Sequence, residues 1–275
     1  MRHHEIKIDK AASDGSTMNA VSSGLRICAI VVVLLVLWQS AVSLLQLPPF
    51  ILPGPWSVAQ SGAANFFYLM GHAGITASEI LIGLTLGLFM GVLTGLLMAM
   101  SSSVERLVFP VVLATQALPV FAIAPLLVLW FGFGLASKVI MATLIIYFPI
   151  TSAFYDGLRR TDPDLLDLGR ISGATPLQSL LHLRLPSALP SLSSGLRVGA
   201  TLAPIGAVVG EWVGSSAGLG FIMLHANARM QTDLMFAALF ILALFVLLLR
   251  FATEYLTRRL VFWMPESHAG TPSLT

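Results

Sequence analysis

Long apolar stretches separated by short polar segments dominate the hydropathy pattern of this chain. A helix needs about 20 apolar residues to cross a hydrocarbon core of about 30 Å. Six stretches approach that length, although the third and the fifth are interrupted by prolines and polar residues. We therefore predict six transmembrane helices with both termini on one side, at residues 25–45, 75–100, 107–131, 139–158, 195–212 and 234–256.

The composition supports this prediction and excludes other classes of protein. The 275 residues are 56% hydrophobic and only 10% charged, and the mean hydropathy is +0.87. Soluble domains carry about 25% charged residues, and disordered chains combine low hydrophobicity with high net charge. We expect an all-α polytopic protein that is embedded in a lipid bilayer. The net charge is only +2, and no basic cluster indicates a nucleic-acid partner.

The first apolar stretch has two interpretations. Basic residues precede it and small residues follow it, as in a secretory signal, but it exceeds the usual apolar region of about 7–15 residues. We expect residues 25–45 to be an uncleaved transmembrane anchor. The polar residues 1–24 before it are expected to form an N-terminal tail.

The basic residues indicate the orientation of the chain in the membrane. With six spans, 13 of the 15 Lys and Arg residues lie on one side, and only Lys138 and Arg229 lie on the other. Cytoplasmic loops are enriched in Lys and Arg near the ends of spans. We therefore expect a cytoplasmic N-terminus, a cytoplasmic loop at 159–190 and a cytoplasmic C-terminal tail at 260–275.

The second predicted span carries glycines at a spacing of four residues, at Gly83, Gly87, Gly91 and Gly95. This spacing places all four on one face of a helix. Small residues let helix backbones approach closely in lipid. We expect a packing seam here, and a surface along which helices slide is the alternative interpretation.

The cytoplasmic loop 159–190 predicts two short helices. Asp162 is suited to cap a helix that begins at Pro163, since the missing N–H of proline has no partner at the first helical position. Gly173 is suited to end this helix. Thr175 and Gln178 then have the spacing of a capping box for a second helix.

The second helix of the loop is expected to begin at Pro176 and to end at Pro186. Leucines at helical spacing give it an apolar face: Leu177, Leu180 and Leu181. An amphipathic helix of this kind either lies against the membrane surface or binds another protein. The residues alone leave both possibilities open.

This loop resembles the coupling motif of permease subunits of ATP-binding-cassette (ABC) importers. That motif has a Glu-Ala-Ala triplet, then three intervening residues and a glycine. Nine further intervening residues separate this glycine from isoleucine, any residue, leucine and proline. Here the triplet is replaced by Asp167-Leu168-Gly169, and Gly173 matches the glycine. Leu183 takes the isoleucine position, and Leu185 with Pro186 matches the closing pair.

The resemblance implies the type I ABC importer permease fold, with the second loop helix docked in a groove of a separate ATPase subunit. The residues expected to couple the chain to the ATPase are Asp167, Gly173, Thr175, Pro176, Leu177, Leu180, Leu181, Leu185 and Pro186. The chain has no G-x-x-x-x-G-K-[ST] phosphate loop. We therefore expect it to be no enzyme and to bind no cofactor, and ATP to be used by the partner.

The resemblance covers residues 71–259, and the first span is an addition found in the nitrate, sulfonate and taurine branch of these importers. Segments such as LPPFILPGPWSVAQ and GEWVGSSAGLGFIMLHANARMQTDLMFAAL are most similar to its hydroxymethylpyrimidine subgroup, which imports a thiamine precursor. The resemblance implies a bacterial inner-membrane homodimer with two ATPase subunits and a periplasmic solute-binding protein. The solute is expected to be this precursor, or else a sulfonate, taurine or nitrate.

Polar residues within the predicted spans are candidates for the translocation path, because ionisable groups in a membrane are costly. The candidates are Glu79, Gln116, Tyr147, Glu211 and Trp212. Each has a structural alternative, such as a position at the water boundary for Glu79 and an interface anchor for Trp212. Residues 213–233 are expected to form a re-entrant or surface-lying element on the outer side.

Two other classes of membrane protein remain as alternatives. An ion-coupled secondary transporter needs paired acids or histidines within its spans, and Glu79 with Glu211 makes a poor relay. An intramembrane enzyme needs a nucleophile with its base, or a metal cluster. The sequence contains no H-E-x-x-H motif, and residues 214–218 (GSSAG) have the spacing of G-x-S-x-G.

Overall fold

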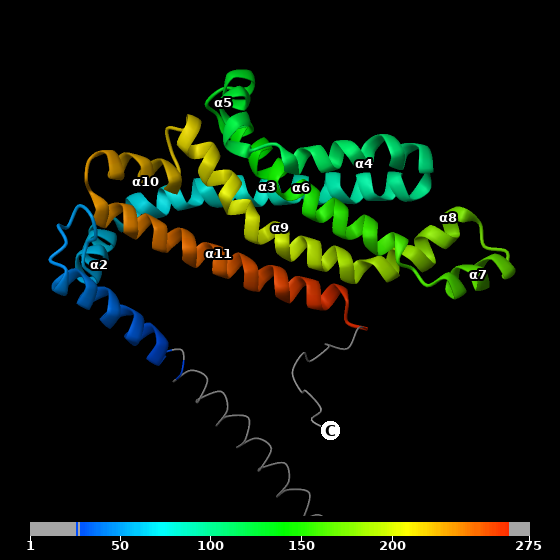
Figure 1. The fold of residues 1–275 in the computed structure, drawn as a ribbon, viewed down its shortest axis with the longest axis horizontal. Coiled ribbons are helices and arrows are strands. Elements are labelled where there is room, and N and C mark those ends of the chain that lie inside the picture. Colours follow the sequence, from blue (N-terminus) through cyan, green and yellow to red (C-terminus); the bar gives the residue numbers. More distant parts are fainter. Residues whose placement is uncertain (1–25, 27, 264–275) are drawn as a thin grey trace, which may run out of the picture.

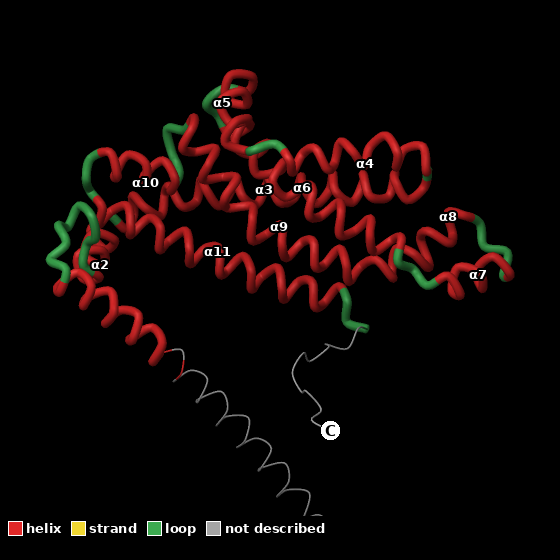
Figure 2. The backbone as a smooth tube through the Cα atoms, viewed as in Figure 1, coloured by secondary structure: helices red, strands yellow, loops and turns green. Residues whose placement is uncertain are grey.

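The computed structural model describes residue 26 and residues 28–263, and within this part of the chain it contains helices and loops but no strand (Figure 2). Four helices are long and apolar enough to cross a membrane, which confirms an all-α membrane protein. They are α3 (Phe66–Met100), α6 (Leu135–Arg159), the continuous helix Pro176–Gly214, and α11 (Thr232–Leu260).

The third predicted span, at 107–131, is not one straight helix. It consists of α4 (Ser102–Ala117) and α5 (Val120–Phe131), which meet at an angle of 101°. Proline disfavours the helical conformation in the residue before it, and Leu118, just before Pro119, is extended with φ −78° and ψ 125°. The bend turns α5 away from the long axis of the bundle (Figure 1).

The first predicted span corresponds to a shorter apolar helix, Cys28–Leu44. Its 17 residues extend about 26 Å, just below the length of a full crossing, so the predicted count of six spans is not established. The predicted tail 1–24 and most of the tail 260–275 lie outside the described residues. Helix α2 (Pro55–Ala64) follows and packs against α11.

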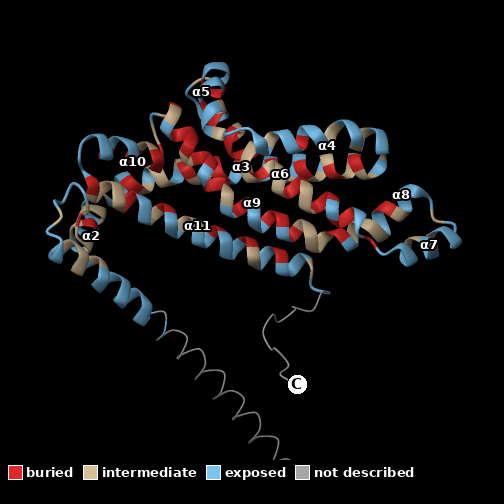
Figure 3. Ribbon diagram, in the orientation of Figure 1, coloured by how far each residue is buried: buried red, intermediate tan, exposed pale blue. Residues whose placement is uncertain are grey.

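The predicted glycine seam is a packing surface between α3 and α6. The four glycines of α3 are buried. A Cβ atom added to Gly83 would lie 2.7 Å from Ala142 Cβ, and one added to Gly95 would lie 2.7 Å from Phe154 Cδ1. Any larger residue would therefore force the two helices apart. Buried residues are concentrated where α3, α6 and α9 (Leu185–Gly214) meet (Figure 3).

The second helix of the cytoplasmic loop does not end at Pro186, and this prediction was wrong. Helix α8 (Pro176–Ser179) continues through a π-helical turn, Leu180–Arg184, directly into α9. Proline has no N–H and its ring clashes with the carbonyl four residues earlier in an α-helix. The wider π turn precedes Pro186, so the chain passes the proline without a break.

The two ends of the elongated bundle are built differently (Figure 1). The short helices α7 (Pro163–Ile171) and α8 lie at one end. At the other end lie α2 and α10 (Leu219–Ala228), and α10 packs against α9 and α11. The predicted re-entrant or surface-lying segment 213–233 thus contains the short helix α10, which is held against the protein with Leu219, Ile222 and Met223 buried.

Candidate functional site

The predicted coupling loop forms a helical hairpin at one end of the molecule. Asp162 caps α7 by accepting a hydrogen bond of 2.9 Å from Asp164 N. At the other end of α7, Gly173 has φ +78°, a backbone conformation that favours glycine. Ala174 N donates to Gly169 O at 2.9 Å, which closes a Schellman turn. The glycine thus reverses the chain between the two helices.

A capping box begins the second helix, as predicted. Thr175 N donates to Gln178 Oε1 at 2.8 Å, and Gln178 N donates to Thr175 Oγ1 at 3.3 Å. Pro176 occupies the first turn of α8. Helix α8 is continuous with α9 through the π turn, so the hairpin joins a membrane-spanning helix without an intervening loop.

The leucines of the hairpin have two different roles. Leu180 is only 5% exposed and packs with Phe154 and Leu158 of α6, and Leu185 packs against the same cluster. Leu177 and Leu181 are 55% and 46% exposed. Of the predicted apolar face, therefore, only Leu177 and Leu181 are available to a partner.

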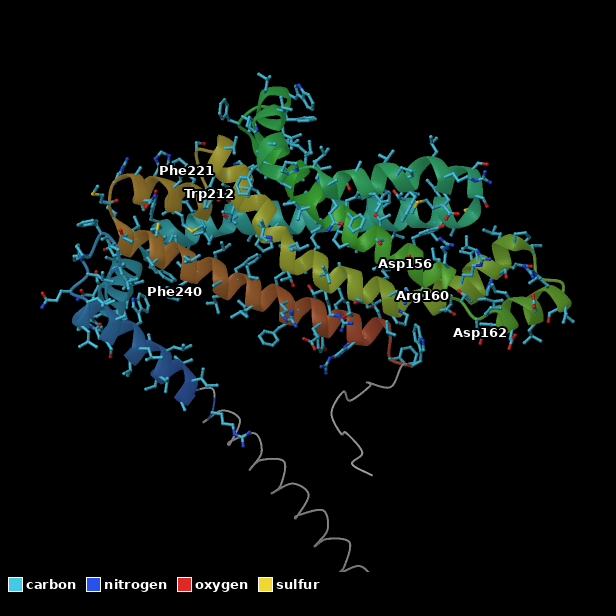
Figure 4. The ribbon with its side chains drawn as sticks, in the orientation of Figure 1. Asp156, Arg160, Asp162, Trp212, Phe221 and Phe240 are labelled. Carbon is cyan, nitrogen blue, oxygen red and sulfur yellow. The ribbon has the colours of Figure 1, made fainter. Side chains whose placement is uncertain are left out.

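The polar residues of the hairpin lie on its surface. Asp167 forms an exposed ion pair with Arg170, with 2.7 Å between Oδ1 and Nη1. Asp162 and Arg160, at the junction of α6 with α7, lie at the same end of the molecule (Figure 4). The hairpin thus presents leucines and charged groups together.

A second cluster of polar residues is buried among the spans. Glu79 of α3 is 0% exposed, and its Oε1 lies 3.0 Å from Nζ of Lys138 of α6. Neither carboxylate oxygen of Glu79 has a partner in hydrogen-bond geometry among the described residues. The contact with Lys138 is therefore a charge pair without a well-aligned hydrogen bond, and Glu79 Oε2 is left without a donor.

Glu211 of α9 is 1% exposed and lies close enough to Glu79 for their charges to interact. Its Oε1 accepts a hydrogen bond of 2.6 Å from Thr76 Oγ1, and its Oε2 accepts one from Gly220 N. Gly220 is the second residue of α10, so the carboxylate lies at the positive end of a helix. A Cβ atom at Gly218 would collide with this carboxyl group.

Helix α3 also holds the loop before α10. Gly218 N donates to His72 Nδ1 at 2.9 Å, and Leu219 N donates to Thr76 Oγ1 at 2.8 Å. The Thr76 hydroxyl therefore accepts from the loop and donates to Glu211. These bonds join two spans, α3 and α9, to the start of α10. Within the described residues no group of three or more His, Cys, Asp or Glu side chains is arranged to hold a metal ion.

The structure brings together two of the five residues predicted for the translocation path, Glu79 and Glu211. Tyr147 lies elsewhere and donates a hydrogen bond of 3.0 Å to Thr94 Oγ1. Gln116 is exposed near the end of α4. Trp212 is 43% exposed and lies near the outer end of α9 (Figure 4).

Sequence analysis missed the residues that complete the buried cluster: His72, Thr76 and Lys138. Lys138 was counted only as an outer-side charge, although a lysine within an apolar run was itself a signal that a carboxylate lies nearby. The pairing of Thr76 with Glu211 spans 135 residues, and no local pattern predicts such a contact.

The helical spans and the helical hairpin define a permease subunit of the type found in ABC importers. Residues 83–262 match the family of inner membrane components of binding-protein-dependent transport systems. The chain belongs to this family and is a transmembrane, non-enzymatic subunit that works with an ATPase and a solute-binding protein.

Curated relatives cover most of the chain. A probable ABC transporter permease protein of Haemophilus influenzae is 51% identical over 85% of this chain and 95% of its own length. The formylaminopyrimidine transport permease protein ThiX of Halalkalibacterium halodurans is 38% identical (84% and 92%). The riboflavin transport system permease protein RibX of Chloroflexus aurantiacus is 40% identical (84% and 87%).

Two further comparisons bear on the branch and on the fold. The taurine transport system permease protein TauC of Escherichia coli is 29% identical over 85% of this chain and 88% of its own length, which agrees with the predicted sulfonate and taurine branch. An inward-facing MetNI methionine ABC transporter has a chain that matches with a TM-score of 0.63 and 22% identity, over 70% of this chain and 96% of that chain. This likeness confirms the permease fold.

Proposed function

We propose that the hairpin formed by α7 and α8 is the surface on which the ATPase subunit docks. The observation that carries this proposal is the pair of exposed leucines, Leu177 and Leu181, on a helix continuous with membrane-spanning α9. Apolar side chains at the end of a membrane protein are stabilised when a partner removes them from water. A push on α8 then moves α9 without bending a loop.

The proposed assembly contains two copies of this chain, two ATPase subunits and one periplasmic solute-binding protein. In this arrangement the termini and the hairpin lie in the cytoplasm, and α10 faces the binding protein. The chain itself binds no cofactor, and ATP is hydrolysed by the partner. Closure of the two ATPase subunits draws the two hairpins together and opens the path toward the outside.

The proposed solute is a small polar molecule, with a pyrimidine precursor of thiamine preferred. The named pyrimidine permease ThiX supports this choice. The riboflavin and taurine permease proteins are the reasons to test other solutes beside it. The proposed path includes the exposed side chain of Trp212 and the region around Glu79 and Glu211.

Reconstitution tests the proposal directly. The chain is placed in liposomes with its ATPase and its binding protein, and uptake of radiolabelled formylaminopyrimidine, taurine and riboflavin is measured with ATP on the ATPase side. We expect uptake of one solute that requires ATP and the binding protein. It should persist with an uncoupler, and a hydrolysis-deficient ATPase should abolish it.

Two results contradict the proposal. Uptake that an uncoupler abolishes while ATP is held constant indicates an ion-coupled transporter. Uptake by the chain alone, without the ATPase, shows that no docking surface is needed. If only taurine or riboflavin is taken up, the ATPase-driven mechanism stands and the pyrimidine assignment is wrong.

A further inference from the structure

A polar groove lies between α9 and α11, away from both sites described above. It has a volume of about 470 Å³. The two helices pack side by side along their length (Figure 1). The polar side chains that line the groove are Ser194, Arg197 and Thr201 of α9, and Arg250 and Glu254 of α11.

Both arginines lie well inside their helices. Arg197 is twelve residues after Leu185, and Arg250 is ten residues before Leu260, so at 1.5 Å per residue they lie about 18 Å and 15 Å from the inner helix ends. Each helix is about 44 Å long, whereas the hydrocarbon core is about 30 Å thick. A helix of this length overhangs the core by about 14 Å, so the two arginines lie inside the inner boundary of the apolar layer or close to it.

The two arginines of this groove form no ion pair within the described part of the chain. Neither Arg197 nor Arg250 has an ion pair or a side-chain hydrogen bond there, and Glu254 accepts a hydrogen bond of 2.9 Å from Arg258 instead. An arginine within a membrane-spanning segment is costly and normally faces a water-filled cavity or a counter-charge. Two arginines on one groove need an anion or water.

The groove is continuous with the exposed face of α9. Exposed residues recur along this helix at Ser194, Val198, Thr201, Ile205 and Trp212. Intervals of three, four and seven residues place them on one side of the helix. The same face therefore leads from the arginine groove to Trp212 at the outer end.

We propose that this groove is a contact site for the anionic group of the transported solute: a sulfonate, a phosphate or a carboxylate. Guanidinium groups bind such oxyanions through paired hydrogen bonds, and Ser194 supplies a further hydroxyl donor. The proposal rests on the ATP-driven import proposed above, and among the solutes named there it favours one with an oxyanion, such as taurine, over the pyrimidine precursor. A lipid phosphate has the same chemistry, so the test must separate lipid from solute.

Cysteine labelling in proteoliposomes tests the site without the ATPase or the binding protein. Cys28 is the only cysteine, so Cys28→Ser gives a background in which Thr201→Cys is the one thiol. Its reaction rate is measured with two methanethiosulfonate reagents, one anionic (sulfonatoethyl) and one cationic (trimethylammonium-ethyl). Each rate is divided by the rate of the same reagent with free cysteine, and the two ratios are compared. We expect an anionic preference of about tenfold, and slower labelling when inorganic sulfate is added.

Matched variants identify the source of the preference. Changing both arginines to Gln in the Thr201→Cys protein should abolish the preference, and changing both to Lys should retain most of it. Leu248→Cys is a control on the other side of α11, where Leu248 is 59% exposed. It should react with neither reagent if that side faces lipid.

Three results overturn the proposal. Thr201→Cys that is as unreactive as Leu248→Cys shows that the groove faces lipid. An anionic preference that survives both Gln changes shows that the arginines do not create it. Protection by sulfate in detergent but not in bilayers shows that the arginines hold lipid phosphate. If Thr201→Cys is labelled with an anionic preference but the protein shows no ATP-dependent uptake, the anion site stands and the proposed function is wrong.

Discussion

Thr76 of α3 donates a hydrogen bond of 2.6 Å to Glu211 of α9, and the same hydroxyl accepts one of 2.8 Å from Leu219 N. One buried threonine thus joins two spans and the start of α10. A buried donor or acceptor that loses its partner costs more than the bond itself contributes, so this small side chain has a large effect on the outer end of the bundle.

Replacing Thr76 with valine tests this joint. Valine has nearly the same shape but leaves Glu211 Oε1 and Leu219 N without a partner, so we expect a loss of about 1–3 kcal/mol in unfolding free energy. Thermal unfolding in detergent measures it. The control is Thr85→Val on the exposed side of α3, where the hydroxyl bonds only to Leu81 O. Equal stability of the two variants would contradict a special role for Thr76.

Lys138 is the only cation paired with the buried carboxylates among the described residues. Lys138→Met leaves Glu79 and Glu211 without a positive charge, and breaking a buried pair by removing one partner costs about 3–5 kcal/mol. The double variant Lys138→Met with Glu79→Gln has the net charge of the natural cluster, so it should recover much of this loss. A double-mutant cycle by thermal unfolding measures the coupling.

The exposed pair Asp167 and Arg170 is the reference for this cycle. Surface pairs contribute about 0–1 kcal/mol, so Arg170→Met should have little effect on stability. If the Lys138 and Glu79 changes were simply additive, the 3.0 Å contact between their side chains would not be an energetic coupling.

Gly173 is a position where backbone geometry is tied to the proposed coupling. At φ +78° with open space around it, Gly173→Val strains the backbone without a collision, since β-branched residues strongly disfavour positive φ. We expect the hairpin to lose its turn, ATPase activity to become uncoupled from uptake and the subunit to remain in the membrane. The measurements are ATP hydrolysis and uptake in the same proteoliposomes.

Gly71 of α3 also has open space for a side chain, but its φ is not positive. Gly71→Val is therefore the matched control and should leave coupling intact. If Gly173→Val supports normal uptake per ATP hydrolysed, the hairpin turn has no part in coupling.

The sequence predicted the features that depend on local rules. Hydropathy located the long helices, and the spacing of Thr175 with Gln178 predicted the capping box that the structure shows. The positions of Gly83 and Gly95 predicted a close helix contact. Each of these follows from residues within a single segment of the chain.

The features that the sequence did not predict depend on contacts between distant segments. The path of the chain through Pro186 required a π turn that packs Leu180 against α6. The sequence showed prolines interrupting the third stretch, but it did not predict the size of the 101° bend at Pro119. Arg197 and Arg250 were assigned to the cytoplasmic side, and only the packing of α9 on α11 shows that they share a groove.

Leu177 of α8 is exposed and Leu180 of the adjoining π turn is buried, and this difference separates docking from folding. Leu177→Asp changes a side chain that is 55% exposed, so we expect normal membrane insertion and thermal stability but loss of ATPase copurification. Leu180→Asp buries a carboxylate beside Phe154 and Leu158, and we expect a loss of about 3 kcal/mol or more in stability. Leu177→Ile retains an apolar surface and should restore copurification. If Leu177→Asp retains the ATPase at the natural level, the exposed leucine face is not the docking surface, and the hairpin must hold its partner through charged groups such as Asp167 and Arg170.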